Sequence, residues 1–383
     1  MSLPDQKETR RRFTDGTRLA SIIGLAIAGQ IGVSLLFDLP FNPSLGGDSG
    51  RYISGGESFP HLDSVQWGYF GYCFVFWIAT NLALTQWLVV VLQILASLWA
   101  AWALWSIAEK YAGRRAGFFA SAFYLLNPLI AQWNRYLLTD SLFYVGVITI
   151  LYGLVVKEIS FRSQIPTALG MLVVVSMRPN GIILIPAVLV FLSVRFTQSR
   201  FSRTVLTSLI MAISAIAFTL LPNLQSGGGG ESNSFVQRAA KGEVFWSSTE
   251  QSLSMPQVSA DETSNTDFLR YVLSNPIDMA RLGITRAVWE TIQVRPWYSS
   301  SLNLFAAIST GVLAFGSALG VGTVRRAGGL IPVLVLTIPS ISLVAATWAI
   351  QEGRFGWWYL VVWIPVAAVG LELVLRRFVT RLT

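Results

Sequence analysis

Apolar stretches long enough to cross a lipid bilayer recur along almost the whole chain. Hydrophobic residues make up 53% of the 383 residues, and charged residues only 13%. The hydrocarbon core of a bilayer is ~30 Å thick, and a helix needs about 20 apolar residues to cross it. Because these stretches leave no room for a soluble domain of ordinary size, we expect an all-α polytopic membrane protein.

The hydropathy pattern predicts about ten transmembrane helices. They cover residues 19–37, 84–108, 115–133, 139–157, 165–177, 180–196, 203–222, 300–322, 328–350 and 355–376. Pro179 interrupts the apolar run between 165 and 196, so we interpret that run as two short spans separated by a turn. The predicted transmembrane domain is 19–376, with tails at 1–18 and 377–383.

Basic residues predict the orientation, because short cytoplasmic loops collect Lys and Arg. With these spans, most of the 28 Lys and Arg residues fall on the side of both termini. We therefore expect a multi-pass protein of the cell (plasma) membrane with cytoplasmic N- and C-terminal tails. The net charge of +8 reflects this asymmetry, so no nucleic-acid partner is predicted. Arg10-Arg11-Arg12 imitates a secretory signal, but no small-residue cleavage pattern follows, so we expect an uncleaved first span.

Two predicted extracytoplasmic loops are much longer than the others, and we call them the first and the second insertion. Loop 38–83 contains an aromatic stretch, 67–77, that is typical of the membrane interface. Loop 223–299 opens with four glycines, 227–230, and has helical spacing over 267–295, interrupted at Asn275-Pro276. A loop of this length usually covers an active site or contacts a partner.

The polar residues at the ends of the spans gather on the outer side in this topology. They are Asp48, Arg51, Tyr52, Glu57, Arg135, Asp140, Arg178, Asn180, Glu352 and Arg354. Charged groups at membrane depth are costly and mark functional sites, although an interfacial anchor or a salt bridge between helices explains any single one of them. We expect segments 46–57, 134–140, 178–181 and 352–355 to bound one cavity.

Four of these segments resemble motifs of the GT-C superfamily of membrane glycosyltransferases, in its protein-mannosyltransferase and aminoarabinose-transferase-like branch. Gly47-Asp48-Ser49-Gly50-Arg51-Tyr52 is similar to the first-loop Asp motif of that superfamily. Asn127-Pro128 followed by Arg135-Tyr136-Leu137-Leu138-Thr139-Asp140-Ser141-Leu142-Phe143 resembles its Asn-Pro segment and Leu-Thr-Glu-Ser-Leu run, with Asp140 replacing the commoner Glu. Arg178-Pro179-Asn180-Gly181 and Gly353-Arg354-Phe355 resemble its Arg-Pro element and terminal Arg-Tyr/Phe motif.

The resemblance implies sugar transfer from a polyprenyl-phosphate donor to a glycan, lipid or protein acceptor at the outer membrane face. Residue chemistry fits this expectation, because an acceptor hydroxyl needs a carboxylate base to take its proton, and Asp48 is the predicted base. Guanidinium groups stabilise the charge that grows on the leaving phosphate, which favours Arg354, Arg178 and, behind them, Arg135. A single displacement would invert the anomeric centre.

Other residues of the constellation have less defined roles. We expect Asp140, Tyr52, Arg51, Glu57 and Asn180 to position substrate or a metal. No cofactor is certain, but Asp48 and Asp140 together offer the hard oxygen ligands that suit Mg²⁺ or Mn²⁺. The alternatives remain open: Asp48 as a helix cap or a partner of Arg51, Asp140 as a helix N-cap, and Glu57 or Asp63 as the base.

Two other classes of function compete with transfer. A polytopic transporter or lipid flippase without transferase activity would have a similar number of spans, but it usually shows internal repeats and charges near the bilayer centre, and neither is evident. A non-catalytic scaffold that binds partners through 223–299 is the other. His61, Trp67 and Cys73 are expected to be a surface residue, an interfacial anchor and a packing residue.

Overall fold

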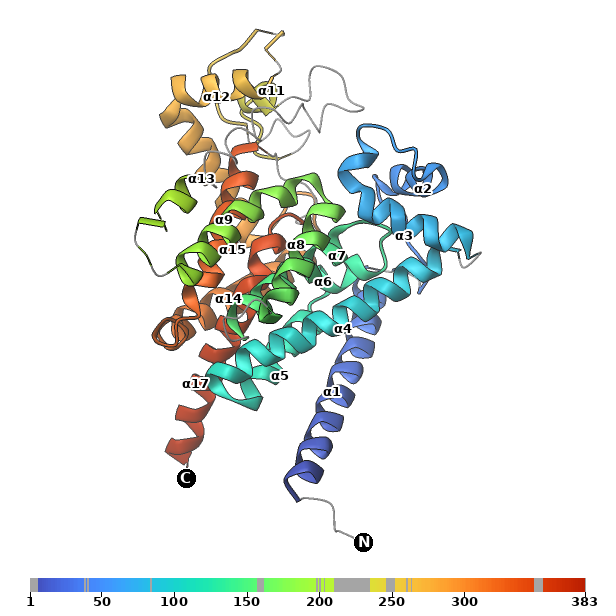
Figure 1. The fold of residues 1–383 in the computed structure, drawn as a ribbon, viewed down its shortest axis with the longest axis vertical. Helices are drawn as coiled ribbons and strands as arrows, with labels where there is room; N and C mark the ends of the chain where they lie inside the picture. Colours follow the sequence, from blue (N-terminus) through green and yellow to red (C-terminus); the bar gives the residue numbers. More distant parts are fainter. Residues whose placement is uncertain are drawn as a thin grey trace.

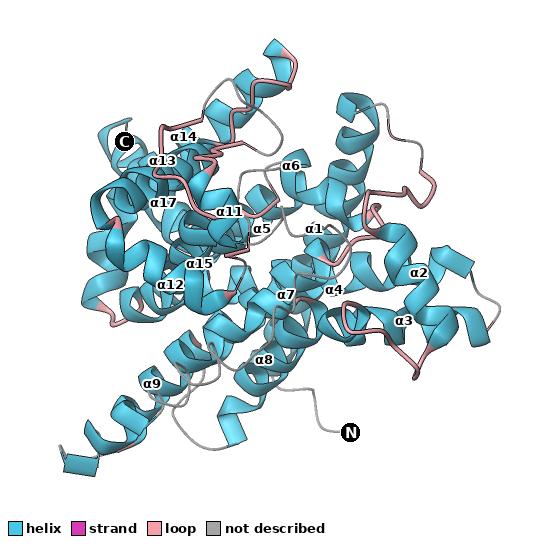
Figure 2. Ribbon diagram, turned by 90° about the horizontal axis from the view of Figure 1, so that it is seen from above, coloured by secondary structure: helices cyan, strands magenta, loops and turns pink. Residues whose placement is uncertain are grey.

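The fold is described by a computed structural model, which covers residues 6–37, 39, 41–82, 85–156, 162–197, 199, 201–202, 204–209, 235–245, 252–259, 261–262, 264–347 and 354–382. The regular secondary structure of the described part is helical, with loops between the helices and an isolated parallel bridge between Ser44 and Tyr136, and the described residues contain no named strand (Figure 2). The expected all-α fold class is therefore found wherever the structure describes the chain. Span 203–222, the glycines 227–230 and Glu352 lie wholly or largely outside the described residues.

The first half of the chain contains a long N-terminal helix, an outer pair and a central group. These elements are α1 (Gln6–Phe37), α2 (Ser49–Ser58), η1 (Gln66–Tyr69), α3 (Phe70–Asn81), α4 (Thr85–Ala112), α5 (Arg114–Leu126), α6 (Pro128–Ala131), η2 (Gln132–Asn134), α7 (Asp140–Val155), η3 (Arg162–Gln164), α8 (Ile165–Met177), η4 (Pro179–Ile183) and α9 (Leu184–Phe196). The second half contains α11 (Phe235–Ala240), α12 (Asn265–Ser274), α13 (Pro276–Ile292), α14 (Ser300–Arg326), α15 (Leu330–Thr347), α16 (Trp357–Leu360), η6 (Val361–Trp363) and α17 (Ile364–Leu382).

Helix α7 lies at the centre of the bundle and is buried along its whole length. It packs along α8 and α4, while α4 also packs along α5 and α14 packs along α17. The α14–α17 crossing is close because Gly316 and Gly320 face Gly370, and a Cβ atom on any of them would overlap the backbone of the other helix. Small residues allow such close approach between membrane helices, where dispersion contacts replace the hydrophobic effect.

Five stretches in the described residues are long and apolar enough to cross a membrane. They are Gly16–Phe37, Gln86–Ala112, Pro179–Phe196, Ser300–Arg326 and Trp357–Thr380, and three shorter apolar helices lie at Asp140–Val155, Ile165–Met177 and Leu330–Leu343. The prediction of about ten spans is therefore met only in part. The shortfall has a physical reason: at 1.5 Å per residue, a helix of the length of α8 rises only about 20 Å. Residue Pro128 likewise ends the expected span 115–133 early, and α5 and α6 replace it.

The expected break at Pro179 is confirmed, because α8 ends at Met177 and α9 begins at Leu184. The break at Asn275-Pro276 is also confirmed, since it separates α12 from α13. The start of α1 and the end of α17 lie at one end of the molecule, and α2 and α11 to α13 lie at the other (Figure 1). The two expected loop insertions thus share one end, opposite the described ends of the chain.

The second insertion has a small apolar core of its own. Its residues are Val236, Ala239, Ala240, Val244, Phe245, Met255, Phe268, Tyr271, Met279 and Leu282. Ser264 begins α12 with a capping box, in which its hydroxyl accepts from the Asp267 N–H and the Asp267 carboxylate accepts from the Ser264 N–H. The insertion is therefore a folded subdomain over its described residues rather than a plain loop.

Candidate functional site

The loop that carries Asp48 is fixed to the segment before α7. The Ser44 N–H donates to the carbonyl of Arg135 over 2.9 Å, and the Leu137 N–H donates to the carbonyl of Ser44 over 2.9 Å. Ser49 Oγ donates to the carbonyl of Leu137 over 2.9 Å and accepts from the Gly46 N–H over 2.8 Å. These backbone contacts hold Asp48 beside the start of α7.

Asp48 occupies the N-cap position of α2, but its side chain makes no capping hydrogen bond. Its carboxylate is directed away from the helix instead. Oδ2 accepts from Arg354 Nη2 over 3.0 Å, and Oδ1 lies 3.7 Å from Arg51 Nη1. Of the two rival explanations for Asp48, helix capping has no support in this geometry, whereas pairing with Arg51 is present as a long and partly exposed contact.

Arg354 reaches the site from the segment just before α16. The hydroxyl of Tyr144, on α7, donates to the carbonyl of Arg354 over 2.8 Å. The guanidinium of Arg354 lies 5.2 Å from the ring centre of Phe355. Burial lowers the pKa of Arg354, but the charges of Asp140 and Asp48 raise it by more, so that this pKa lies above its ordinary value. The group is therefore a permanent cation in the site.

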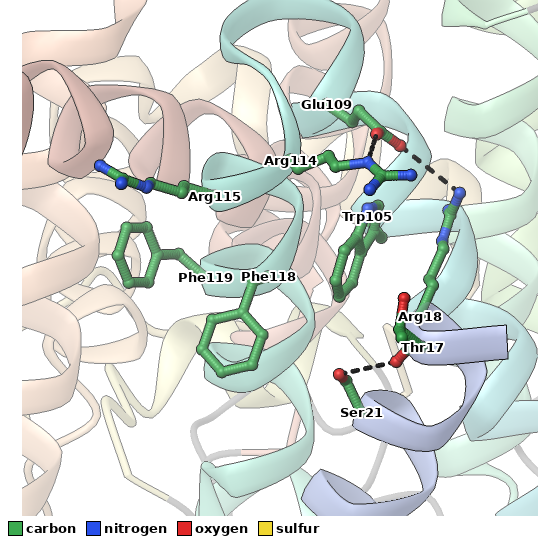
Figure 3. A pocket seen from close by; sticks show the side chains of 9 residues that line it. All are labelled: Thr17, Arg18, Ser21, Trp105, Glu109, Arg114, Arg115, Phe118 and Phe119. Carbon is green, nitrogen blue, oxygen red and sulfur yellow. Dashed lines mark hydrogen bonds and ion pairs between the residues drawn. The ribbon is translucent and has the colours of Figure 1, made fainter. Parts of the chain in front are cut away.

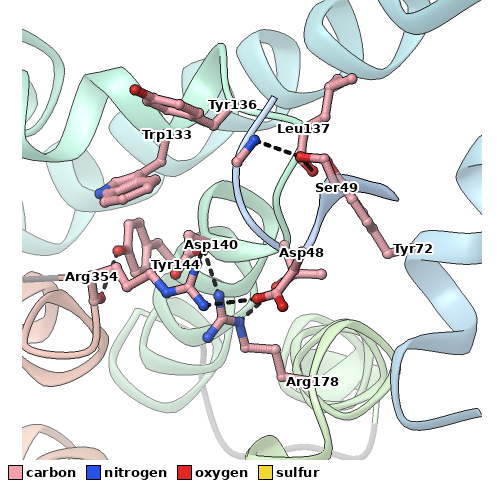
Figure 4. Close-up of polar contacts among 12 residues, drawn as sticks. Asp48, Ser49, Tyr72, Trp133, Tyr136, Leu137, Asp140, Tyr144, Arg178 and Arg354 are labelled. Atoms are coloured by element: carbon pink, nitrogen blue, oxygen red, sulfur yellow. Dashed lines mark hydrogen bonds and ion pairs between the residues drawn. The ribbon is translucent and has the colours of Figure 1, made fainter. Parts of the chain in front are cut away.

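Asp140 and Arg178 form a buried ion pair next to the Asp48–Arg354 pair. Asp140 Oδ2 lies 2.5 Å from Arg178 Nη2 and 3.9 Å from Arg354 Nη1. Arg178 Nε donates to Thr139 Oγ1 over 2.6 Å, and its guanidinium lies 5.2 Å from the ring centre of Trp358. Figure 4 shows the four charged side chains pointing toward one another from four separate segments.

Exposure separates the two carboxylates. The Asp48 side chain is 30% exposed, whereas that of Asp140 is 0% exposed. Thr139 is the N-cap of α7 and makes no side-chain capping bond, and Asp140 is the first helical residue. The expected alternative, Asp140 as the N-cap of α7, is therefore wrong by one residue, because Thr139 occupies that position. A substrate can reach Asp48, whereas Asp140 acts only on the guanidinium groups around it.

The residues do not fit the expected metal site as they stand. Arg354 contacts both carboxylates, through Nη2 to Asp48 and Nη1 to Asp140, and so lies where a bridging cation would bind. Among the described residues, no group of three or more His, Cys, Asp or Glu side chains has an arrangement that could hold a metal ion. We therefore derive no step through Mg²⁺ or Mn²⁺.

The structure places the other predicted residues around this cluster or away from it. Tyr52 is buried below the site, with its ring centre 5.1 Å from that of Tyr69, and burial raises its pKa above the ordinary value. Asn180 lies in η4, two residues after Arg178. Glu57 is exposed near the end of α2.

Among the described residues, Arg135 contacts α1 rather than the charged cluster. Its Nε donates to Gln30 Oε1 over 2.8 Å, and its Nη1 donates to Ser34 Oγ over 2.7 Å. The guanidinium also lies 4.4 Å from the ring centre of Phe41. This arginine therefore ties the segment before α7 to α1.

The remaining residues of the first insertion have structural surroundings. Asp63 Oδ1 accepts from the N–H groups of Val65 and Gln66, over 2.8 and 2.7 Å, which gives this alternative base a turn-forming contact. His61 is exposed, Trp67 is 55% exposed, and Cys73 is buried.

Two groups of site residues were missed by reasoning from the sequence. Tyr144 lies four residues after Asp140, on the same face of α7, so helical spacing alone would have indicated it. Glu290 and Arg295 form a fully buried ion pair of 2.7 Å, and the backbone carbonyl of Glu290 lies so close to Gly356 that a Cβ atom on that glycine would overlap it. No signal in the sequence links these two residues to the segment that carries Arg354.

Comparison with known proteins supports the membrane fold. A sequence model of the family described as GPI transamidase subunit PIG-U matches residues 70–250, which include Asp140 and Arg178 but not Asp48 or Arg354. No curated protein matches this chain in sequence.

Two solved structures from Archaeoglobus fulgidus are similar to this chain. One is the archaeal oligosaccharyltransferase AglB in complex with an inhibitory peptide and a dolichol-phosphate, with a TM-score of 0.50 and 12% identity over 95% of this chain and 51% of that one. The other is an oligosaccharyltransferase in complex with Zn and sulfate, with a TM-score of 0.43 and 16% identity over 93% of this chain and 50% of that one. This chain spans about half the length of each.

At this identity, the likeness to AglB concerns the fold. The similarity extends over 95% of this chain, so it concerns the arrangement of the helices as a whole. The match to the PIG-U family, also a membrane family, agrees with the apolar spans. The chain is therefore a multi-pass membrane protein with a fold similar to that of this oligosaccharyltransferase.

Proposed function

We propose that this protein transfers a sugar from a polyprenyl-phosphate-linked donor to an acceptor at the membrane face that carries α2. The observation that carries the proposal is the contact between Asp48 and Arg354, a partly exposed carboxylate beside a buried guanidinium. These are the two groups that such a transfer needs, namely a base for the acceptor and a cation for the leaving phosphate. The predicted outer face of a plasma membrane, with both tails cytoplasmic, is part of the same proposal.

In the proposed reaction, Asp48 removes the proton from the acceptor hydroxyl while the acceptor oxygen attacks the anomeric carbon. The bond between that carbon and the phosphate oxygen breaks, and the lipid phosphate leaves with the electron pair. The acceptor is glycosylated, and a single displacement inverts the anomeric configuration. No enzyme nucleophile is needed.

Arg354 is the better placed phosphate ligand of the two arginines. Its Nε is buried and has no hydrogen-bond partner among the described residues, so it can donate to a phosphate oxygen. A phosphate bound to Arg354 would also compete with Asp48 for this guanidinium. Donor binding would then free the Asp48 carboxylate to accept a proton, which links arrival of the donor to activation of the base.

Asp140 and Arg178 support Arg354 in this scheme. The Asp140 carboxylate faces both guanidiniums, and Arg178 is packed against Trp358. An ion pair buried to this degree is costly to break by removing one partner. We infer that it holds the position of Arg354 rather than contacting the sugar.

The test compares Asp48→Asn with Glu57→Gln, a matched change of an exposed carboxylate on the same short helix. Membranes from cells that express each variant are incubated with a panel of radiolabelled polyprenyl-phosphate sugars, and label in glycan, lipid and protein fractions is counted. We expect Asp48→Asn to lower transfer by ~10²–10⁴-fold, the usual contribution of a general base, and Glu57→Gln to retain it. An Asp48→Asn variant with more than half the wild-type rate would rule out Asp48 as the base.

A second candidate function is that of a non-catalytic subunit in a larger membrane enzyme. It is favoured by the match to the PIG-U family, which is described as a subunit of GPI transamidase. Under this alternative, the purified chain transfers no label from any donor in the panel and co-purifies with a catalytic partner. Asp48→Asn would then leave the activity of that assembly unchanged.

A further inference from the structure

A cavity lies at the opposite end of the molecule from Asp48, between residues 17–21 of α1 and the end of α4 with the start of α5. Its volume is about 320 Å³. Its lining includes Arg18, Trp105, Glu109, Arg114 and Arg115, and Figure 3 shows Arg18 and Arg114 on either side of Glu109. The volume falls at the lower end of the range for small-ligand sites, about 300–1,000 Å³.

The lining is strongly cationic, with three guanidiniums and one carboxylate. Glu109 contacts two of these guanidiniums. Its Oε2 lies 3.5 Å from Arg18 Nη1, and its Oε1 lies 3.6 Å from Arg114 Nε. Both separations exceed the ~2.7–2.9 Å of a strong charge-assisted hydrogen bond. Among the described residues, the lining carries more positive than negative charge, which favours an anionic ligand.

Arg18 is held in place for such a ligand. Its Nη2 donates to the carbonyl of Trp102 over 2.8 Å and to Ser106 Oγ over 2.5 Å. The guanidinium carbon also lies 4.9 Å from the ring centre of Trp102 and 5.2 Å from that of Trp105. A cation fixed by aromatic rings and backbone loses little conformational freedom when it binds an anion.

The depth of the cavity indicates which anion it meets. The candidate span of α1 begins at Gly16 and that of α4 ends at Ala112, so the cavity lies where two spans end. Phe118, which also lines it, is 39% exposed. Aromatic and basic side chains at the ends of spans lie at the level of the lipid headgroups.

We infer that this cavity binds the phosphate of an anionic phospholipid headgroup in the leaflet at the end of the molecule opposite the Asp48 site. Arg18 and Arg114 contact the phosphate, Arg115 adds positive charge at the edge of the cavity, and the aromatic rings contact the upper part of the lipid (Figure 3). The site is independent of the proposed sugar transfer, because it lies at the other end of α4. It would fix the start of α1 against α4 and α5.

The test measures binding of phosphatidylglycerol and phosphatidylcholine with matched acyl chains to the full purified chain by native mass spectrometry. Arg114→Gln/Arg115→Gln is the test variant, because both side chains are exposed and their loss leaves the packing intact. Arg325→Gln/Arg326→Gln is the matched control, since these exposed arginines end α14 near the same end of the molecule. We expect phosphatidylglycerol binding to weaken about fivefold for each charge removed in the test variant, and the control to bind as wild type does.

Three results would overturn the inference, and the first two concern lipid binding. They are equal binding of the two lipids by the wild-type protein, and equal losses in the test and control variants. The third concerns the source of the phosphate. If inorganic phosphate alone raises the melting temperature as much as phosphatidylglycerol does, with the same dependence on Arg114 and Arg115, the cavity binds a free anion and the lipid assignment is wrong.

Discussion

Asp48 Oδ2 lies 3.0 Å from Arg354 Nη2, although 306 residues separate the two in the chain. The contact joins the first insertion to the segment before the last candidate span. The candidate site is therefore complete only when the C-terminal part of the bundle has packed against the N-terminal part. The same dependence on distant residues holds for the glycine-rich segment Gly46–Gly50, which is fixed by contacts with residues far along the chain.

Arg354→Ala should lower kcat/KM for the lipid-linked donor by ~10²–10³-fold, the usual effect of removing one group that stabilises transition-state charge. Arg354→Lys should restore only part of this loss, because an ammonium group cannot form the bidentate fork of a guanidinium. The control is Arg51→Ala, which removes a partly exposed partner of Asp48 at 3.7 Å and should have little effect. Equal kinetics for Arg354→Ala and wild type would remove Arg354 from the site.

Asp140→Asn should destabilise the protein by about 3–5 kcal/mol, because it leaves Arg178 buried without a counter-charge. Thermal unfolding in detergent measures this loss. Asp48→Asn is the matched comparison, and it should cost about 1 kcal/mol or less, since the Asp48 carboxylate is 30% exposed. Similar melting temperatures for the two variants would show that the Asp140–Arg178 pair does not hold the site together.

Arg295→Ala should destabilise the contact between the second insertion and the segment that carries Arg354. Burial raises the pKa of Glu290 above its ordinary value of 4.5, while Arg295 lowers it. Removal of Arg295 should raise the folded-state pKa further. Because the folded protein then favours the neutral carboxyl, the loss of stability is small below the ordinary value and grows as the pH rises through the folded-state pKa.

Melting temperatures across a pH series test this expectation, with Arg281→Ala as the control at an exposed position of α13, the helix that carries Glu290. Transfer activity should fall in Arg295→Ala as well, since the end of α13 around Glu290 packs against Gly356, two residues after Arg354. A pH-independent loss equal to that of Arg281→Ala would contradict the coupling.

Cysteine labelling tests the proposed orientation. Ser254→Cys should react with an impermeant thiol reagent in intact cells, because Ser254 is exposed in the second insertion. Thr380→Cys, near the exposed end of α17, should react only after permeabilisation. The native Cys73 is buried and gives little background. The reverse pattern would place Asp48 on the cytoplasmic side and contradict transfer at the outer face.

Much of the site could be predicted from the sequence, because charge is expensive at membrane depth and residues that bear it stand out. Asp48, Asp140, Arg178 and Arg354 were all found this way, and the structure brings them together. Arg135 was predicted for the same reason, a charge at membrane depth, but it contacts α1 instead. The sequence does not distinguish a charged residue that binds a substrate from one that connects two helices, since both need partners in a medium of low polarity.

The fold was predictable to a similar degree. Proline marked the end of α8 and the junction of α12 and α13, because it removes a backbone donor and restricts the residue before it. The number of spans was not predictable, since hydropathy does not show that α7 and α8 are short helices or that α7 is buried along its whole length. The Glu290–Arg295 pair was also missed, because its meaning depends on contact with Gly356 across the tertiary structure.

The most direct test of the proposed transfer is an experimental structure of the protein with a polyprenyl-phosphate bound. The account predicts phosphate density within hydrogen-bond distance of the Arg354 guanidinium, with the Asp48 carboxylate released from Arg354 and facing the aqueous side. The same measurement on Asp48→Asn should show the phosphate in the same place, because the base does not hold the donor. Phosphate density away from both Arg354 and Asp48 would contradict the account.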